Sequence, residues 1–263
     1  MQYQISGKGS PIVLVPGGLT GWISWEPHAR ILSDKHTVLR VQLLNVQYGL
    51  ENRPLPAGYS VETEAGALAS TLDSLGFKTP IDVVGWSYGA FTALQYSLDH
   101  PERIRTLTLI EPPAMWVLRE KGAFDEATQE DAVFFSTLHG NITEDMLAEF
   151  LQHAGFLKPG QSARELPQWN TWLNFRQSLR NSPSVVTYTD DLKRLQRLHA
   201  PTLLVKGTGS SAWLHRVIDA LARNLPQSRT VEYPGGHAPH IVSMDKFMMT
   251  LEEFQDLSGN RTG

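Results

Sequence analysis

Short apolar runs alternate along the chain with longer stretches in which apolar residues recur every three or four positions. The apolar runs predict buried strands in the segments 11–18, 36–44, 81–84, 103–113, 200–209 and 229–236. The longer stretches predict helices at 59–76, 88–99, 212–225 and 244–254. Because strands separated by helices of this length form βαβ units, the pattern predicts an α/β fold with a mostly parallel central sheet flanked by helices.

Residues 113–195 break this alternation, because their pattern is mostly helical with few strand signals. We therefore expect a core built from residues 1–112 and 196–263, with 113–195 as an inserted helical cap. The inserted stretch is rich in aromatic residues: Trp116, Phe134, Phe135, Phe150, Phe156, Trp169, Trp172 and Phe175. These side chains either line a pocket or form the cap's own core, and the pattern leaves both interpretations open.

Composition narrows the class of protein. The chain has 263 residues, of which 41% are hydrophobic, and this is enough for one large core. Its net charge is −4, so it lacks the basic character expected of a protein that binds nucleic acid. The absence of cysteine excludes disulfides, cysteine nucleophiles and thiolate metal sites. No apolar run approaches the roughly 20 residues that span a bilayer, and the N-terminal segment lacks the features of a signal peptide, so we expect a cytoplasmic location.

A serine lies between two glycines directly after the predicted strand 81–84, in the sequence Gly85-Trp86-Ser87-Tyr88-Gly89. A strand, a sharp turn and a helix in this order are typical of a nucleophile elbow, in which small neighbours allow a strained turn to expose the serine hydroxyl. The alternative is a loop serine with two packing glycines. The context favours Ser87 as a nucleophile.

A serine hydroxyl needs a base to accept its proton. His237 follows the predicted strand 229–236 and comes 150 residues after Ser87, with a final helix behind it. We prefer it to His240 of the same loop, which we expect at the surface or at a pocket rim. No histidine spacing typical of a metal site is present, so we predict no metal.

These motifs, in this order, resemble those of the α/β-hydrolase fold enzymes. The "PGG" loop after the first strong strand, "GWSYG" and "GGHAPH" extend the resemblance over nearly the whole chain. It implies a nucleophile at Ser87, a base at His237 and no cofactor. It also implies an oxyanion hole formed by the N–H groups of Tyr88 and Leu19, with Gly18 keeping the approach open.

The position of the triad acid departs from the usual pattern of that family. Members usually carry an acid after the strand that here ends in "TLLVKG", but residues 208–212 read "TGSSA". Glu111 lies at the end of the strand before, 24 residues past Ser87. Some members, including haloalkane dehalogenases and a fungal zearalenone lactonase, resemble this arrangement. We therefore predict that Glu111 orients the histidine; a salt bridge at the cap junction is the alternative role for Glu111, and Asp190 or Asp191 is the next candidate acid.

The resemblance implies a serine hydrolase that cleaves a small to medium-sized, apolar ester or lactone through an acyl-enzyme. A C–C bond hydrolase or a cofactor-free perhydrolase with the same triad is the alternative, followed by a small-molecule receptor. We expect a small-molecule substrate as the partner, and a homodimer remains open. Four tryptophans are candidates for the apolar walls of the substrate site, with a core role as the alternative: Trp86, Trp22, Trp116 and Trp172.

Overall fold

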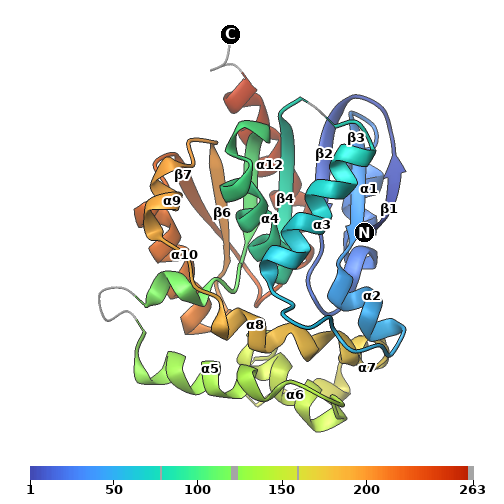
Figure 1. The fold of residues 1–263 in the computed structure, drawn as a ribbon, viewed down its shortest axis with the longest axis vertical. Helices are drawn as coiled ribbons and strands as arrows, with labels where there is room; N and C mark the ends of the chain where they lie inside the picture. The colour runs from blue at the N-terminus through green and yellow to red at the C-terminus, as the bar shows by residue number, and fades with distance from the viewer. Residues whose placement is uncertain (78, 120–123, 159, 260–263) are drawn as a thin grey trace.

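A computed structural model describes residues 1–77, 79–119, 124–158 and 160–259 of the chain (Figure 1). One seven-stranded sheet has the strand order β1-β3-β2-β4-β5-β6-β7. Its strands are β1 (Gln2–Ser6), β2 (Ser10–Val15), β3 (His36–Gln42), β4 (Ile81–Trp86), β5 (Ile104–Ile110), β6 (Thr202–Gly207) and β7 (Ser228–Tyr233). The β1–β3 pair is antiparallel and the other pairs are parallel, which confirms the predicted α/β class with a mostly parallel sheet.

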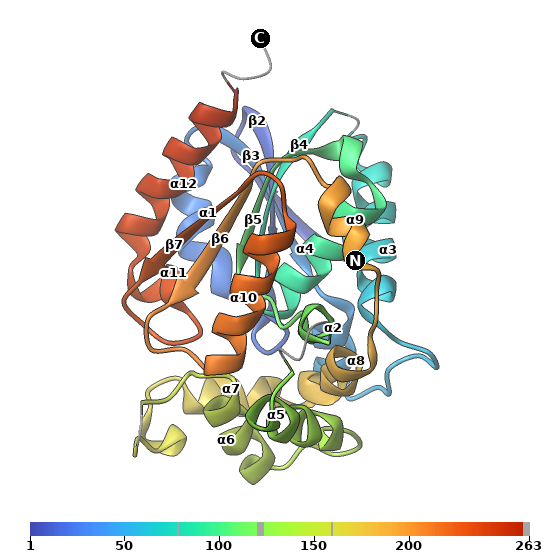
Figure 2. The same cartoon turned by 90° about the vertical axis from the view of Figure 1, so that its left-hand side faces the viewer.

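Helices cover both faces of the sheet (Figure 2). One face carries α1 (Glu26–Leu32) and α12 (Met244–Gly259), and the other carries α3 (Val61–Ser74), α4 (Tyr88–Asp99), α9 (Leu192–Arg197) and α10 (Ala212–Asn224). Side chains that alternate along a strand point to opposite faces. Leu14 of β2 therefore belongs to the hydrophobic cluster of α12, whereas Val13 belongs to that of α3.

The segments between β5 and α9 lie together against the edge of the sheet at which the parallel strands end (Figures 1 and 2). They are η3 (Met115–Leu118), α5 (Glu126–Thr137), α6 (Glu144–His153), η4 (Ala163–Glu165), α7 (Trp169–Phe175), η5 (Arg176–Asn181) and α8 (Ser182–Thr187). Their buried side chains join the same hydrophobic cluster as α3, α4 and α10. The division into a core and a cap at 113–195 stays a prediction, and residues 120–123 and 159 of that cap lie outside the described residues.

Shorter elements complete the chain: η1 (Gly21–Trp25), α2 (Leu44–Leu50), η2 (Pro101–Arg103) and α11 (Pro239–Val242). The sequence pattern did not predict β1, whose residues are all exposed, so that it carries no run of buried apolar positions. No helix within the described ranges combines the length and the apolar character needed to cross a membrane.

Candidate active site

Ser87 lies in the sharp turn that joins β4 to α4. Its backbone has φ 54° and ψ −126°, a region that non-glycine residues rarely adopt and that costs on the order of 1–3 kcal/mol. The Ser87 N–H donates to the carbonyl of Ile110 at 2.8 Å, which ties the turn to the neighbouring strand β5. The turn therefore has the strained geometry that the flanking glycines predicted.

The two flanking glycines are required by the close approach of other backbone atoms. A Cβ at Gly85 would lie 2.6 Å from the Cα of Ala90, inside the first turn of α4. A Cβ at Gly89 would lie 2.2 Å from the carbonyl oxygen of Pro16, in the loop after β2. Only glycine allows α4 to begin this close to β2, and this packing determines where the serine hydroxyl lies.

His237 lies directly beside the serine. Its Nε2 is 2.7 Å from the Ser87 Oγ, and only 3% of the residue is exposed. Two backbone contacts hold its loop: its N–H donates to the carbonyl of Gly155, and its carbonyl accepts from the indole N–H of Trp86 at 2.7 Å. The residue before Ser87 is thus hydrogen-bonded to the loop that carries the imidazole.

Glu111 contacts the other nitrogen of the imidazole, and it is fully buried. Its Oε2 lies 3.0 Å from the Nδ1 of His237, and its Oε1 accepts from the N–H of Gly207 at 2.8 Å. The hydroxyl of Ser210 donates to Oε2. Because a carboxylate can only accept, the imidazole proton is on Nδ1, and Nε2 is left to accept the proton of the Ser87 hydroxyl.

The backbone of Glu111 also departs from ordinary strand geometry, with φ 48°. This turn at the end of β5 directs the carboxylate across the sheet edge toward β6, where the Gly207 N–H accommodates it. The loop after β6, which lacks the acid of the usual family position, supplies the hydroxyl of Ser210 to that carboxylate instead.

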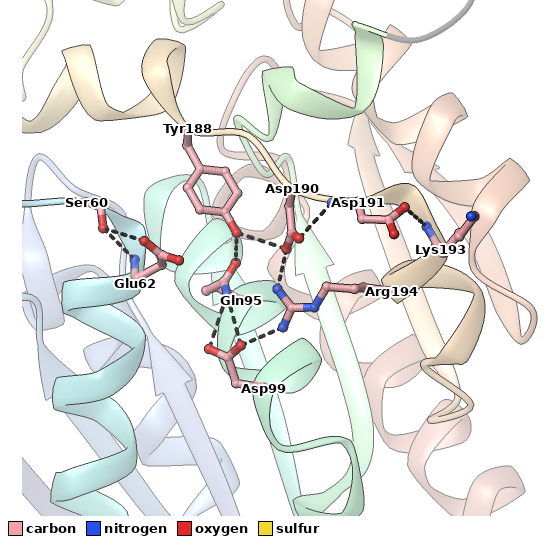
Figure 3. A network of polar contacts seen from close by, with 9 residues as sticks. All are labelled: Ser60, Glu62, Gln95, Asp99, Tyr188, Asp190, Asp191, Lys193 and Arg194. Atoms are coloured by element: carbon pink, nitrogen blue, oxygen red, sulfur yellow. Dashed lines mark hydrogen bonds and ion pairs between the residues drawn. The ribbon is translucent and has the colours of Figure 1, made fainter.

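The alternative acids lie in a different network, which Figure 3 shows in close-up. Asp190 accepts from the hydroxyl of Tyr188 at 3.0 Å and forms an ion pair with Arg194. Asp191 accepts from the N–H of Lys193 at 2.9 Å and so caps α9. In the part of the chain that the structure describes, neither carboxylate contacts the imidazole beside the serine.

His240 does not lie at the surface or at a pocket rim, where we expected it, but is fully buried. Its ring packs against those of Trp25, His28 and Trp86, with ring centroids 4.8–5.4 Å apart. Neither of its ring nitrogens has a hydrogen-bond partner among the described residues. Burial, followed by the charges of His28 and His237, holds the pKa of His240 well below its usual value.

A cavity of about 580 Å³, including its opening to solvent, adjoins the Ser87 hydroxyl. Its walls come from the loop after β2, the turn at Ser87, the segments of the predicted cap and α10. They are lined by Gly17, Gly18, Leu19, Trp86, Ser87, Tyr88, Pro113, Phe135, Phe150, Ala154, Phe156, Leu179, Asn181, Ser182, Val185, Trp213 and His237. Most of the lining side chains are apolar, as is typical of small-molecule sites.

The four candidate tryptophans have different positions. Trp86 lines the cavity, and Trp172 lines a neighbouring, more open cavity that shares Trp86, Phe156 and His237 with the first. The structure places the other two outside both cavities. Trp116 is buried beside Tyr188, and Trp22 is half-buried with its N–H bonded to a core glutamine.

The residues predicted for an oxyanion hole line the same cavity. Gly18 and Leu19 belong to the loop after β2, and Tyr88 is the first residue of α4. The first N–H groups of a helix have no carbonyl acceptor within the helix, so the Tyr88 N–H is available to a ligand. Among the described residues, no group of three histidine, cysteine, aspartate or glutamate side chains is arranged to hold a metal ion.

Sequence reasoning missed several residues of the site. Ser210 carried no motif, and its contact with the acid depends on the positive φ that turns Glu111 toward β6. Phe135 and Phe150 were recognised only as aromatic residues of the cap, and Trp213 only as part of a helix. A helical period identifies a buried face but does not tell a cavity wall from a core contact.

Comparisons with known proteins agree with this fold. A family model described as "alpha/beta hydrolase fold" matches residues 10–243. A pimeloyl-[acyl-carrier protein] methyl ester esterase of Nitrosomonas europaea is 24% identical over 265 residues, which cover 95% of this chain and 97% of that protein. A 2-hydroxymuconate semialdehyde hydrolase of Pseudomonas sp. strain CF600 is 32% identical over 167 residues, 59% of this chain and 57% of that protein. The solved structure of an esterase from Exiguobacterium antarcticum superposes with a TM-score of 0.78 at 19% identity, covering 97% of this chain and 94% of that one.

Proposed function

The chain belongs to the α/β-hydrolase fold family, and from this premise we propose that it is a serine hydrolase that cleaves a small to medium-sized, apolar ester or lactone through an acyl-enzyme. The observation that carries the proposal is the line of contacts from the Ser87 hydroxyl through His237 to Glu111, at 2.7 Å and 3.0 Å. A nucleophile and a base in contact, with a third group orienting the base, are the requirements of nucleophilic catalysis.

In the first step the Ser87 Oγ attacks the substrate carbonyl carbon and its proton passes to Nε2 of His237. The carbonyl π-electron pair moves to the oxygen, and the N–H groups of Tyr88 and Leu19 donate to the resulting oxyanion. The Glu111 carboxylate stabilises the imidazolium, because it accepts the hydrogen bond from Nδ1–H.

In the second step the tetrahedral intermediate collapses. The bond to the leaving oxygen breaks as His237 returns the proton to that oxygen, and the acyl group stays on Ser87. A water molecule then attacks the acyl-enzyme, His237 accepts its proton, and the same proton reforms the serine hydroxyl when the acid leaves. In a lactone the released alcohol remains tethered to the acyl group.

The cavity supports an apolar substrate, because most of its lining side chains are aliphatic or aromatic. Phe150 of α6, Phe156 and Trp213 of α10 would surround an acyl group attached to Ser87. The relative from Nitrosomonas europaea, which spans almost the whole chain, is named for the hydrolysis of a methyl ester. Both observations favour ester hydrolysis.

Hydrolysis of a 2-hydroxymuconate semialdehyde-like compound is the second candidate. It is favoured by the 32% identity with the Pseudomonas hydrolase of that substrate, which covers little more than half of each chain. The same serine and histidine would serve this reaction. A substrate panel that includes p-nitrophenyl esters, lactones and such a dienoic semialdehyde separates the two candidates by their kcat/KM values.

We predict that Ser87→Ala folds and loses at least about a thousandfold in kcat on the best substrate of the panel, because members of a triad act as a unit. Glu111→Gln should lose about a hundredfold to ten-thousandfold, because the neutral amide carries no charge and favours the wrong imidazole tautomer. Ser70→Ala, on the exposed side of α3, is the control and should behave as the wild type. Full activity of Ser87→Ala would exclude the proposed nucleophile, and full activity of Glu111→Gln would exclude only the acid.

A further inference from the structure

Gly18 and Leu19 both line the cavity beside Ser87, and one peptide group joins them. Its carbonyl belongs to Gly18 and its N–H belongs to Leu19. Because a trans peptide is planar, these two groups point in opposite directions. Any contact that holds the Gly18 carbonyl on one side therefore sets the direction of the Leu19 N–H on the other.

Asn45, in the first turn of α2, holds this carbonyl. Its Nδ2 donates to the oxygen of Gly18 at 2.8 Å and to the oxygen of Ser178 in η5 at 3.0 Å. Both acceptors are carbonyls, so only the NH₂ end of the amide can face them, and both of its hydrogens are used. The side chain is 1% exposed, which keeps water from competing for these bonds.

Asn45 is itself held from the side of the core. The carboxylate of Glu64 in α3, which is fully buried, accepts from the N–H of Asn45 at 2.8 Å and from that of Leu44 at 2.9 Å. The hydroxyl of Tyr59 donates to the same carboxylate at 2.5 Å. A buried acid at the beginning of α2 thus fixes the backbone from which the Asn45 side chain extends.

Contacts around Gly18 show how tightly the peptide is packed. A Cβ at this position would lie 3.1 Å from the Asn45 Nδ2 and 3.1 Å from the Cβ of Tyr88. The peptide that carries the Leu19 N–H is therefore enclosed between the Asn45 amide and the first residue of α4. The position of the Leu19 N–H relative to the Tyr88 N–H, the two donors assigned to the oxyanion hole, depends on this packing.

We propose that Asn45 is a positioning residue of the oxyanion hole, because its side-chain amide fixes the Gly18–Leu19 peptide so that the Leu19 N–H is directed at the developing negative charge. The proposal rests on the proposed serine hydrolase function. Asn45 touches neither the substrate nor Ser87, and it acts through the Gly18–Leu19 peptide that it binds.

The test compares Asn45→Ala and Asn45→Asp with the wild type on the best ester of the panel. Loss of one complete oxyanion donor costs about a hundredfold to a thousandfold in kcat. A donor that is present but badly directed should cost less, so we expect kcat to fall about tenfold to a hundredfold with KM changed less than about threefold. A trifluoromethyl ketone, whose adduct with a serine is an oxyanion, should lose affinity by the same factor as kcat/KM.

Asn224→Asp is the matched control, since the Asn224 amide also donates to a backbone carbonyl, that of Ala220 in α10. It should leave kcat and the affinity for the trifluoromethyl ketone unchanged. If neither Asn45 variant folds, Asn45→Ser, which keeps one hydroxyl donor, provides the measurement and should lose about threefold to tenfold. A merely structural asparagine would lower the melting temperature but leave kcat per titrated active site and the ketone affinity unchanged.

The outcomes separate this proposal from the proposed function. If the wild type hydrolyses esters, Ser87→Ala is inactive and the folded Asn45 variants keep wild-type kcat and ketone affinity, the positioning role is wrong and the hydrolase function stands. If Ser87→Ala remains active, both are wrong. A parallel loss of kcat and ketone affinity in the Asn45 variants supports both.

Discussion

At the scale of single residues, the site contains two kinds of buried histidine. His237 has a hydrogen-bond partner for each ring nitrogen, Glu111 and Ser87. His240, three residues later, has none among the described residues and is packed between aromatic rings. An imidazole without partners in an apolar environment strongly favours its neutral form.

From this difference we predict that His240 makes the folded protein less stable as the pH becomes acidic. Its pKa in the folded protein lies below the unfolded value of about 6.5, so the unfolded chain binds a proton that the folded protein does not. The contribution of neutral His240 to the free energy of unfolding is therefore fully present above pH 6.5. It is lost as the pH falls, at up to about 1.4 kcal/mol per pH unit. Between pH 7 and pH 5, the free energy of unfolding measured by denaturant titration should fall by about 1–2 kcal/mol less for His240→Phe than for the wild type.

The buried neighbours make the comparison with a variant necessary. Burial raises the pKa values of Glu64 and Asp82, and these carboxyls favour the folded state toward acid, opposite to His240. His28, whose pKa burial lowers, acts in the same direction as His240. His139→Phe, at an exposed position, should leave the pH dependence of the wild type unchanged. Parallel curves for the wild type and His240→Phe would contradict the prediction.

At the scale of elements, Ser87 is placed by the close packing of α4 against the loop after β2. Gly89, in the first turn of α4, allows this approach because it has no Cβ to meet the Pro16 carbonyl. Gly66, in the middle of α3, faces open space instead, since a Cβ there would have no heavy atom of the described neighbouring residues within 4 Å. Glycine thus permits close packing in α4, whereas in α3 it only lowers the stability of the helix.

These two glycines predict opposite effects of one substitution. Gly89→Ala should destabilise the fold by roughly 1–3 kcal/mol or more and reduce kcat, because α4 must move away from β2 and carries the turn at Ser87 with it. Gly66→Ala should stabilise the protein by about 0.5–1 kcal/mol with kcat unchanged, because it restricts the unfolded chain without a clash. Urea denaturation and ester hydrolysis measure both variants, and a stable, active Gly89→Ala would show that the close approach is not needed.

At the scale of the whole molecule, the cavity is assembled from segments far apart in the chain. Its walls include the loop after β2, α4, α6 and α10, which bring Leu19, Tyr88, Phe150 and Trp213 to one space. The network in Figure 3 ties the end of the predicted cap to α4, since Arg194 forms ion pairs with both Asp190 and Asp99. Substrate size should therefore be limited by side chains from the predicted cap, whereas the position of Ser87 is set by the sheet.

Phe150 provides the test of that division. Phe150→Ala should enlarge the acyl space and raise the ratio of kcat/KM for a p-nitrophenyl hexanoate over the acetate by roughly tenfold, as expected for apolar contacts of this size. The matched control is Phe134→Ala, because the Phe134 ring stacks on His153 with centroids 4.3 Å apart and does not line the cavity. An equal change in both variants would indicate a general loosening of the cap rather than a wall at Phe150.

The sequence by itself determined the alternation of strands and helices, the sheet class and the turn at Ser87. These features depend on neighbours in the chain: the apolar run 81–84, the glycines on both sides of the serine, and the helical period that follows. The loop of His237 could be predicted for the same reason, since a glycine pair directly precedes it. Features that depend on neighbouring residues can therefore be recognised in the local sequence.

Only the tertiary structure decided which carboxylate contacts the imidazole, where His240 lies and which aromatic side chains form the cavity. Glu111 reaches His237 because β5 and β6 are neighbours and a positive φ turns its side chain between them. Asn45 meets Gly18 because α2 packs against the loop after β2. Contacts of this kind join residues tens to hundreds of positions apart, and residue type and spacing do not tell which distant element a side chain meets once its own element is packed.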